Sequence, residues 1–163
     1  MVEKHSKKIK KQWDIRKLRR IADYQLGNNI GAILIPDKCK IIYSKNTKRI
    51  REVHYQGKRL ASLRPTDGLF SLGLAGAERI LQQTKKPTRR IIIQSDVSKF
   101  IMEGKSVFAK HVVETDPTIR PEEEVIVVSE EDKLLAVGRA QLSAENILAF
   151  SRGMAVKTRH GVL

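Results

Sequence analysis

The sequence predicts an α+β protein with two domains. Apolar residues recur at helical spacing along residues 13–26, and Gly27 ends that pattern. Much of the remaining chain consists of short β-prone runs separated by turn sequences such as Gln56-Gly57. Residues 82–90 contain no apolar side chain and one proline, a composition typical of a domain boundary. We therefore expect a flexible basic arm at 1–12, an α+β domain at 13–84 and a second domain at 90–163.

The first domain is expected to contain a helix, a meander of strands and a second helix. In the helix at 13–26, the residues expected on the buried face are Ile15, Leu18, Ala22, Gln25 and Leu26. Residues 27–31 are expected to form a loop. The predicted strands are 39–43, 50–55, 59–64 and 69–72, followed by a helix at about 75–83. The arm at 1–12 carries five lysines and almost no residue to bury, so it is expected to be flexible. It could contact phosphates nonspecifically or be a solvated tail, and both alternatives stay open.

The second domain is expected to consist mainly of strands, at 91–94, 106–113, 124–128, 133–140 and 154–159. One helix begins at Ser95 and ends at Gly104, and a short one is capped by Ser143 and reaches Phe150. Side chains alternate along a strand, so 106–113 should place Phe108 and Lys110 on the face opposite Val107. Phe108 could instead pack in the core, and both alternatives stay open.

The net charge of +14 predicts attraction to a polyanion, with nucleic acid favoured. Residues 1–89 hold 22 Lys and Arg against 7 Asp and Glu, whereas residues 90–163 hold 10 against 11. Eight of those 11 acids lie between 114 and 132, so the second domain should have an acidic end and a basic end. A membrane surface is the alternative polyanion, and only the first helix could bind it.

Several other classes of function find little support in the sequence. No apolar run is long enough to span a bilayer, and the single Cys39, expected to be buried and inert, fits a reducing cytoplasm. The four histidines are scattered without the spacing of metal ligands, and Asp14 and Asp23 do not share a helical face. We therefore expect no catalytic site, no metal site, no cofactor and a cytoplasmic location.

Three stretches, 104–113, 137–140 and 155–159, combine a glycine turn with short apolar strands that carry basic residues. Their order along roughly 90–160 resembles the RNA-binding edge of a PUA domain, a mixed β pseudo-barrel. Residues 18–27, 44–53 and 63–72 resemble the domain that precedes PUA in archaeal tRNA-guanine transglycosylases and archaeosine synthases. In that family these C-terminal domains hold tRNA by its acceptor stem and 3′ end, while a separate barrel exchanges the base. No counterpart of the barrel, its aspartates or its zinc-binding cysteines occurs in this sequence.

The resemblance implies an RNA-binding protein, with tRNA favoured, that takes part in tRNA modification without catalysis of its own. Its expected partners are RNA and a tRNA-modifying enzyme, and no membrane. One alternative is a tRNA-binding subunit of a split transglycosylase, and a second is a stand-alone tRNA-ribosyltransferase. The expected RNA-binding residues are Lys99, Gly104, Lys105, Phe108, Lys110, Arg139, Arg152, Lys157 and Arg159. Nonspecific phosphate contacts are expected from Arg16, Arg19, Arg20, Lys48, Arg49 and Arg51.

The glycine turn suggests how such an edge could work. Glycine accepts a positive φ and lets another backbone approach closely, so Gly104 suits a turn next to RNA. We expect the backbone amides that follow Gly104, together with the Lys105 side chain, to meet a phosphate.

Overall fold

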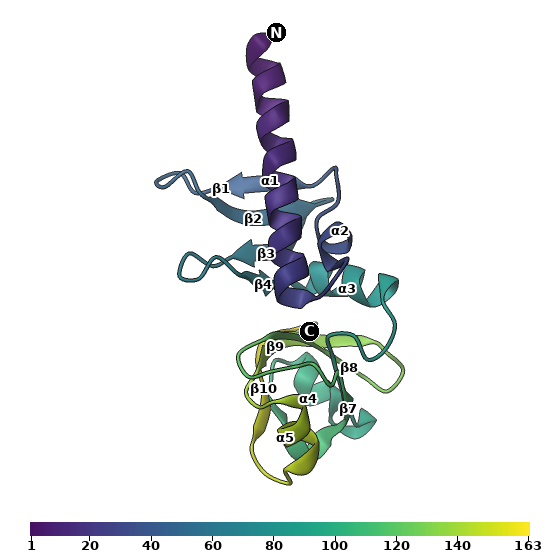
Figure 1. Ribbon diagram of the computed structural model, residues 1–163. Coiled ribbons are helices and arrows are strands. Elements are labelled where there is room, and N and C mark those ends of the chain that lie inside the picture. Colours follow the sequence, from purple (N-terminus) through teal and green to yellow (C-terminus); the bar gives the residue numbers. More distant parts are fainter. The chain divides into compact units, whose positions relative to one another are not determined.

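The computed structural model describes residues 1–163 and divides into two compact units, Met1–Ser71 and Leu72–Leu163. Each unit combines helices with a β-sheet, as Figure 1 shows, so the predicted α+β class is confirmed. The sequence placed the helix at about 75–83 in the first domain, whereas the structure places it in the second unit. None of the helices combines the length and apolar character needed to cross a membrane.

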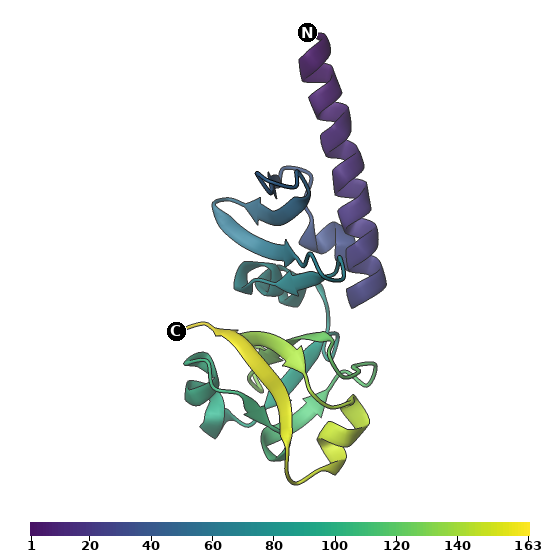
Figure 2. The same cartoon turned by 90° about the vertical axis from the view of Figure 1, so that its left-hand side faces the viewer.

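The first helix, α1 (Val2–Leu26), is longer than predicted. Residues 2–12, which the sequence placed outside the helix, form its first turns. Lysine, glutamate and glutamine are good helix formers, and the pairs Glu3–Lys7 and Lys10–Asp14 add support at i,i+4 spacing. The N-terminal turns extend past the sheet of the same unit (Figures 1 and 2), and residues 1–12 are exposed along their whole length.

The predicted buried face of α1 is confirmed at Ile15, Leu18, Ala22 and Leu26. A short helix that the sequence pattern missed, α2 (Ile30–Leu34), packs against it. A Cβ on Gly31 would lie 2.2 Å from the carbonyl oxygen of Arg19, so the two backbones approach as closely as only glycine allows. The Gly31 amide also donates to Asp23 Oδ1 at 2.7 Å.

Four strands form the sheet of the first unit in the order β1 (Lys40–Tyr43), β2 (Ile50–Tyr55), β3 (Lys58–Leu63) and β4 (Phe70–Leu72), and the pairs β1–β2 and β2–β3 are antiparallel. The predicted strands match these within one residue. At the β4 edge, Gln25 of α1 donates to the Phe70 carbonyl at 2.7 Å and accepts from the Phe70 amide at 2.6 Å. One side chain thus pairs with the strand backbone as a neighbouring strand would.

The second unit begins with α3 (Leu74–Gln83) and contains a six-stranded sheet in the order β6-β10-β9-β8-β5-β7. Its strands are β5 (Arg90–Ile93), β6 (Val107–Phe108), β7 (Val112–Thr115), β8 (Glu124–Val128), β9 (Leu134–Ala140) and β10 (Met154–Gly161). The β5–β8 pair is parallel and the other pairs are antiparallel, so the sheet is mixed. Its helices are the 3₁₀ turn η1 (Ser95–Val97), α4 (Ser98–Met102) and α5 (Ala144–Ala149), and Ser143 caps α5 as predicted.

The predicted strand at 106–113 is wrong in one respect, because a 3₁₀ turn, η2 (Ala109–His111), interrupts it. β6 pairs with β10 at one edge of the sheet, while β7 pairs with β5 at the other. Since η2 joins the two edges directly, it brings them together and nearly closes the sheet into a barrel. The interior is apolar, and its central residues include Ile91, Ile93, Ile101, Val107, Ile119, Val125, Val127, Leu135, Ile147 and Val156.

Candidate nucleic-acid interface

The turn after α4 has the open backbone that the sequence predicted. Gly104 has φ +96°, and a Cβ placed on it would meet no atom within 4 Å. Lys99 and Lys105 lie exposed on either side of the turn. The backbone amides are not available as expected, because Gly104 donates to the Ile101 carbonyl at 2.9 Å and Lys105 to the Phe100 carbonyl at 3.0 Å. A phosphate here would therefore be bound by lysine side chains.

Exposed aromatic rings accompany these lysines. Phe108 is 48% exposed, which answers the open question of whether it packs in the core. Phe100 on α4 is 56% exposed, although an apolar residue in a helix would ordinarily be assigned to the core and the sequence pattern gave no reason to single it out. Phe108 pairs with Met154, and the Ala109 amide donates to the Gly153 carbonyl at 2.9 Å. This pairing brings the segment carrying Lys110 next to the turn carrying Arg152.

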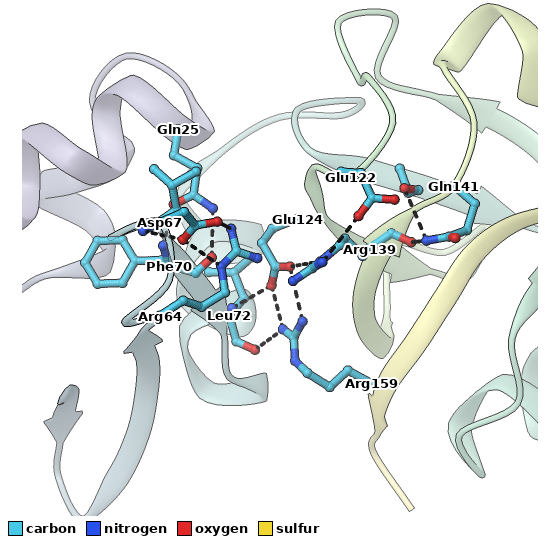
Figure 3. Close-up of polar contacts among 12 residues, drawn as sticks. Gln25, Arg64, Asp67, Phe70, Leu72, Glu122, Glu124, Arg139, Gln141 and Arg159 are labelled. Atoms are coloured by element: carbon cyan, nitrogen blue, oxygen red, sulfur yellow. Dashed lines mark hydrogen bonds and ion pairs between the residues drawn. The ribbon is translucent and has the colours of Figure 1, made fainter.

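A third group of predicted residues lines a small cavity of about 370 Å³. Arg139, Lys157 and Arg159 border it together with Glu122, Gln141 and Thr158. Arg159 donates to Glu124 Oε2 at 3.1 Å and to the Leu72 carbonyl at 2.8 Å, and the Glu124 side chain is fully buried (Figure 3). Arg139 lies within 3.3 Å of Glu122 and 3.9 Å of Glu124. Arg159 thus serves to neutralise a buried carboxylate, and only Lys157 of the three has no partner within the protein.

The acidic segment 114–132 also differs from expectation. Instead of forming one exposed acidic end, most of its eight acids engage groups of the fold. Asp132 binds Arg90, Glu123 binds Arg89, and Glu124 binds Arg159. Burial would raise the pKa of Asp116, but hydrogen bonds from Thr118 and the Arg89 amide outweigh burial and lower that pKa.

The six basic residues assigned to nonspecific phosphate contact fall into three groups. Lys48, Arg49 and Arg51 line a large cavity of the first unit. Arg19 is not free, because it donates to the Ile35 carbonyl and to Asp37, both at 2.9 Å. Arg16 and Arg20 are exposed on α1 but do not line this cavity, and Arg16 stacks on the Trp13 ring. The sequence reading missed the other basic residues of this cavity, among them Lys17 and Arg59, because they come from α1 and β3.

In the second unit, strand β10 links the glycine turn, the exposed aromatic residues and the basic residues described above. Its first residue, Met154, pairs with Phe108, and Lys157 lies midway along it. At its end, a Cβ on Gly161 would lie 2.8 Å from the Gly104 amide nitrogen, so the strand touches the glycine turn. We call this surface the PUA edge and define it by the residues Lys99, Gly104, Lys105, Phe108, Lys110, Arg152 and Lys157. Such a surface can bind an anion and stack a base, and no three His, Cys, Asp or Glu residues of the chain gather as metal ligands would.

The barrel, with its mixed sheet and glycine turn, defines the class of this protein: it is a PUA-domain protein, and residues 89–162 match that domain family. Residues 16–87 match the family described as patch-forming domain C2 of tRNA-guanine transglycosylase. The chain therefore consists of two domains that match the C-terminal region of archaeal tRNA-guanine(15) transglycosylases.

Two such relatives illustrate the match. The tRNA-guanine(15) transglycosylase of Methanobrevibacter smithii is 45% identical over 150 residues, which cover 91% of this chain and 23% of the relative. The enzyme of Pyrococcus furiosus is 43% identical over 142 residues, covering 87% of this chain and 24% of the relative. The chain thus spans about a quarter of the length of these relatives.

Solved structures share the fold of the whole chain. A hypothetical protein from Pyrococcus horikoshii OT3 superposes with a TM-score of 0.73 at 22% identity, covering 91% of this chain and 89% of that one. A conserved PUA domain protein from Thermoplasma acidophilum has a TM-score of 0.65 at 18% identity, covering 93% and 89%. At these identities the likeness concerns the fold.

Proposed function

We propose that this chain binds tRNA through the PUA edge and acts in tRNA modification without catalysis of its own. The observation that carries the proposal is the open Gly104 turn, flanked by exposed Lys99 and Lys105 and accompanied by exposed phenylalanines. Aromatic rings stack unpaired bases, and lysines bind the adjoining phosphates. A single-stranded RNA end offers both groups at once, which favours the 3′ end of a tRNA as the ligand.

A binding comparison tests this proposal. Gly104→Glu adds bulk and negative charge at the turn, and we expect it to weaken binding to intact tRNA far more than it lowers the melting temperature. Gly57→Glu is the matched control, because Gly57 also has positive φ and open space but lies in the β2–β3 turn of the first unit. Removing the 3′ end should weaken wild-type binding and abolish the difference between the two variants. Equal binding of intact tRNA by Gly104→Glu and Gly57→Glu would refute the proposal.

The relatives favour a second candidate, a tRNA-binding subunit that serves a separate transglycosylase barrel. Its support is the match to about a quarter of enzymes named tRNA-guanine(15) transglycosylase. In a guanine-exchange assay, the purified chain alone should give no turnover, and adding it to a barrel that lacks these domains should raise turnover. Turnover by the chain alone, abolished by one point substitution, would instead identify a stand-alone tRNA-ribosyltransferase.

A further inference from the structure

The side of α1 that faces away from its own unit carries a line of apolar residues. Val2, Ile9, Trp13 and Tyr24 are all exposed, Trp13 at 66% and Tyr24 at 87%. At about 100° per residue, these four side chains point within an arc of about 60°. That arc is opposite the buried face of α1, so packing within the first unit does not account for it. We call these four residues the outer stripe.

The residue types along this side of α1 are those of a protein interface. Single exposed apolar residues are common on protein surfaces, whereas an aligned set is typical of an interaction site. Trp, Tyr and Arg most often supply the anchors of such sites. Arg16 and Arg20 connect Trp13 to Tyr24 at i,i+3 and i,i+4 spacing. Arg16 stacks on the Trp13 ring, and that ring still remains two-thirds exposed.

The width of the stripe indicates what shape of partner fits it. Contact residues of a two-helix seam recur at alternating steps of four and three residues, as do Val2, Ser6, Ile9, Trp13, Arg16 and Arg20. The stripe is about one residue wide and extends roughly 33 Å along the axis, which suits a second helix lying alongside α1. A helix that lies on a membrane needs a broader apolar face.

The charges of α1 favour an acidic partner. Residues 1–26 contain nine lysines and arginines against three acids. All three acids are engaged within the protein, Glu3 by Lys7, Asp14 by Lys10 and Asp23 by a backbone amide. A second copy of α1 would bring like charges together, which is unfavourable. Acidic side chains at the edges of a partner helix would instead neutralise the basic residues that flank the seam.

RNA fits this side of α1 less well than a helix does. The major groove of an A-form duplex is too deep and narrow for side chains to enter, and successive unpaired bases stack on neighbouring aromatic rings. Trp13 and Tyr24 are separated by roughly 16 Å along the helix axis, so they do not form one stacking platform. Ile9, which is 42% exposed, has no ring on which a base could stack.

We infer that the outer stripe is a docking surface for an acidic amphipathic helix of a partner protein. Ile9, Trp13 and Tyr24 pack into the apolar seam of that helix. Arg16 and Arg20, predicted from the sequence to contact phosphates, pair with its carboxylates instead. The inference is independent of RNA binding at the PUA edge, because none of these residues belongs to that surface. It gives a chain proposed to lack catalysis a means of joining a second protein.

The test uses the full chain and its single tryptophan. Burial of Trp13 on docking shifts its fluorescence emission to shorter wavelength. The probe is a synthetic helical peptide with leucine at the seam positions and glutamate at the flanking positions, and a scrambled peptide of the same composition controls for charge. Ile9→Ser/Tyr24→Ser removes two stripe residues and keeps the reporter. Val113→Ser/Leu148→Ser is the matched control, because it changes two exposed apolar residues of the second unit.

The ordered peptide should shift the emission of wild type and of the control variant. We expect the stripe variant to bind it about tenfold more weakly, because interface anchors are lost. Arg16→Ala/Arg20→Ala should weaken binding and reduce its salt dependence. All substituted side chains are exposed, so melting temperatures should stay near wild type and show that lost binding is not unfolding. Equal binding of the ordered and scrambled peptides, or equal binding by the stripe and control variants, overturns the inference.

Two further probes test the other occupants. A larger shift of Trp13 emission with phosphatidylserine vesicles than with the ordered peptide would overturn the inference in favour of a membrane surface. Weaker binding of intact tRNA by the stripe variant than by the control variant would overturn it in favour of RNA. Gly104→Glu, which tests the PUA edge, should bind the ordered peptide as wild type does. The proposed function and this inference can therefore fail separately.

Discussion

The guanidinium of Arg90 donates to both carboxylate oxygens of Asp132, at 2.7 and 3.1 Å, and its side chain has no exposure to solvent. The same guanidinium donates to the backbone carbonyls of Leu81, Thr84, Lys85 and Thr88. One buried cation therefore fixes the whole connection between α3 and β5 to the barrel. This explains why residues 82–90, which have the composition of a linker, lie within the second unit.

Replacing Arg90 should be strongly destabilising. Arg90→Ala leaves Asp132 and four carbonyls without their donor, and breaking a buried ion pair from one side costs about 3–5 kcal/mol of unfolding free energy. The control Lys133→Ala changes an exposed neighbour and should stay within about 0.5 kcal/mol of wild type. Urea unfolding followed by circular dichroism measures both. A loss for Arg90→Ala no larger than for Lys133→Ala would contradict the role assigned to this residue.

Arg159 and Lys157, both in β10, should respond in opposite ways to replacement by alanine: one change should lower stability and the other should weaken tRNA binding. Arg159→Ala leaves the buried Glu124 carboxylate without its closest cation, so stability should fall by about 3 kcal/mol or more. Lys157→Ala removes an exposed charge with no partner, so stability should stay unchanged while tRNA binding weakens. Thermal melting and tRNA titration of the two variants separate these effects. A stable Arg159→Ala variant with weakened RNA binding would return Arg159 to the RNA-binding set.

Asp116 should make the second unit sensitive to acid. Its pKa is lowered from the ordinary value of 3.8, so its hydrogen bonds stabilise the fold above that pH. The contribution is lost as the pH falls through the lower pKa of the folded state. Asp116→Asn should cost about 1–3 kcal/mol at neutral pH, because one buried donor then loses its acceptor. Melting temperatures between pH 7 and about pH 2.5 should therefore fall less steeply for the variant than for wild type. Parallel curves would contradict this account.

Two glycines of the second unit should respond differently to alanine. At Gly104 a Cβ has open space and only the positive φ is unfavourable, so Gly104→Ala should cost about 1 kcal/mol. At Gly161 a Cβ would lie 2.1 Å from the Met102 carbonyl oxygen, so the β10 backbone must shift. Gly161→Ala should therefore be the more destabilising change in urea unfolding. If Gly104→Ala were instead the more destabilising change, the backbone at the end of β10 would be shown to shift at little cost in stability.

Lysines of the PUA edge should act through phosphate contacts. Lys105→Ala and Lys110→Ala should each reduce the salt slope of tRNA binding by about one, because each contact releases about one counterion. Neither substitution should change the melting temperature, since both side chains are exposed and without partners. Lys133→Ala, an exposed lysine outside the edge, provides the control slope. Slopes indistinguishable from that control would remove both lysines from the interface.

The sequence by itself determined the features that depend on local patterns. Helical spacing predicted the buried residues of α1, strand propensities and turn residues predicted most strands within a residue or two, and Ser143 marked the start of α5. Gly104 could be identified because a glycine that ends a helix at positive φ has a local signature. The net positive charge of the first 89 residues likewise follows directly from the numbers of basic and acidic residues in the sequence.

Tertiary structure alone decided which charges are free. Arg159 and Lys157 look alike in the sequence, yet Arg159 neutralises buried Glu124 and Lys157 faces solvent, because the partner of Arg159 comes from β8, a strand distant in the sequence. The break at η2 arises because the chain must pass from one sheet edge to the other, a demand that residues 109–111 do not encode locally. The large cavity of the first unit depends on the same kind of long-range assembly, since Lys17, Arg49 and Arg59 meet only when α1, β2 and β3 pack together.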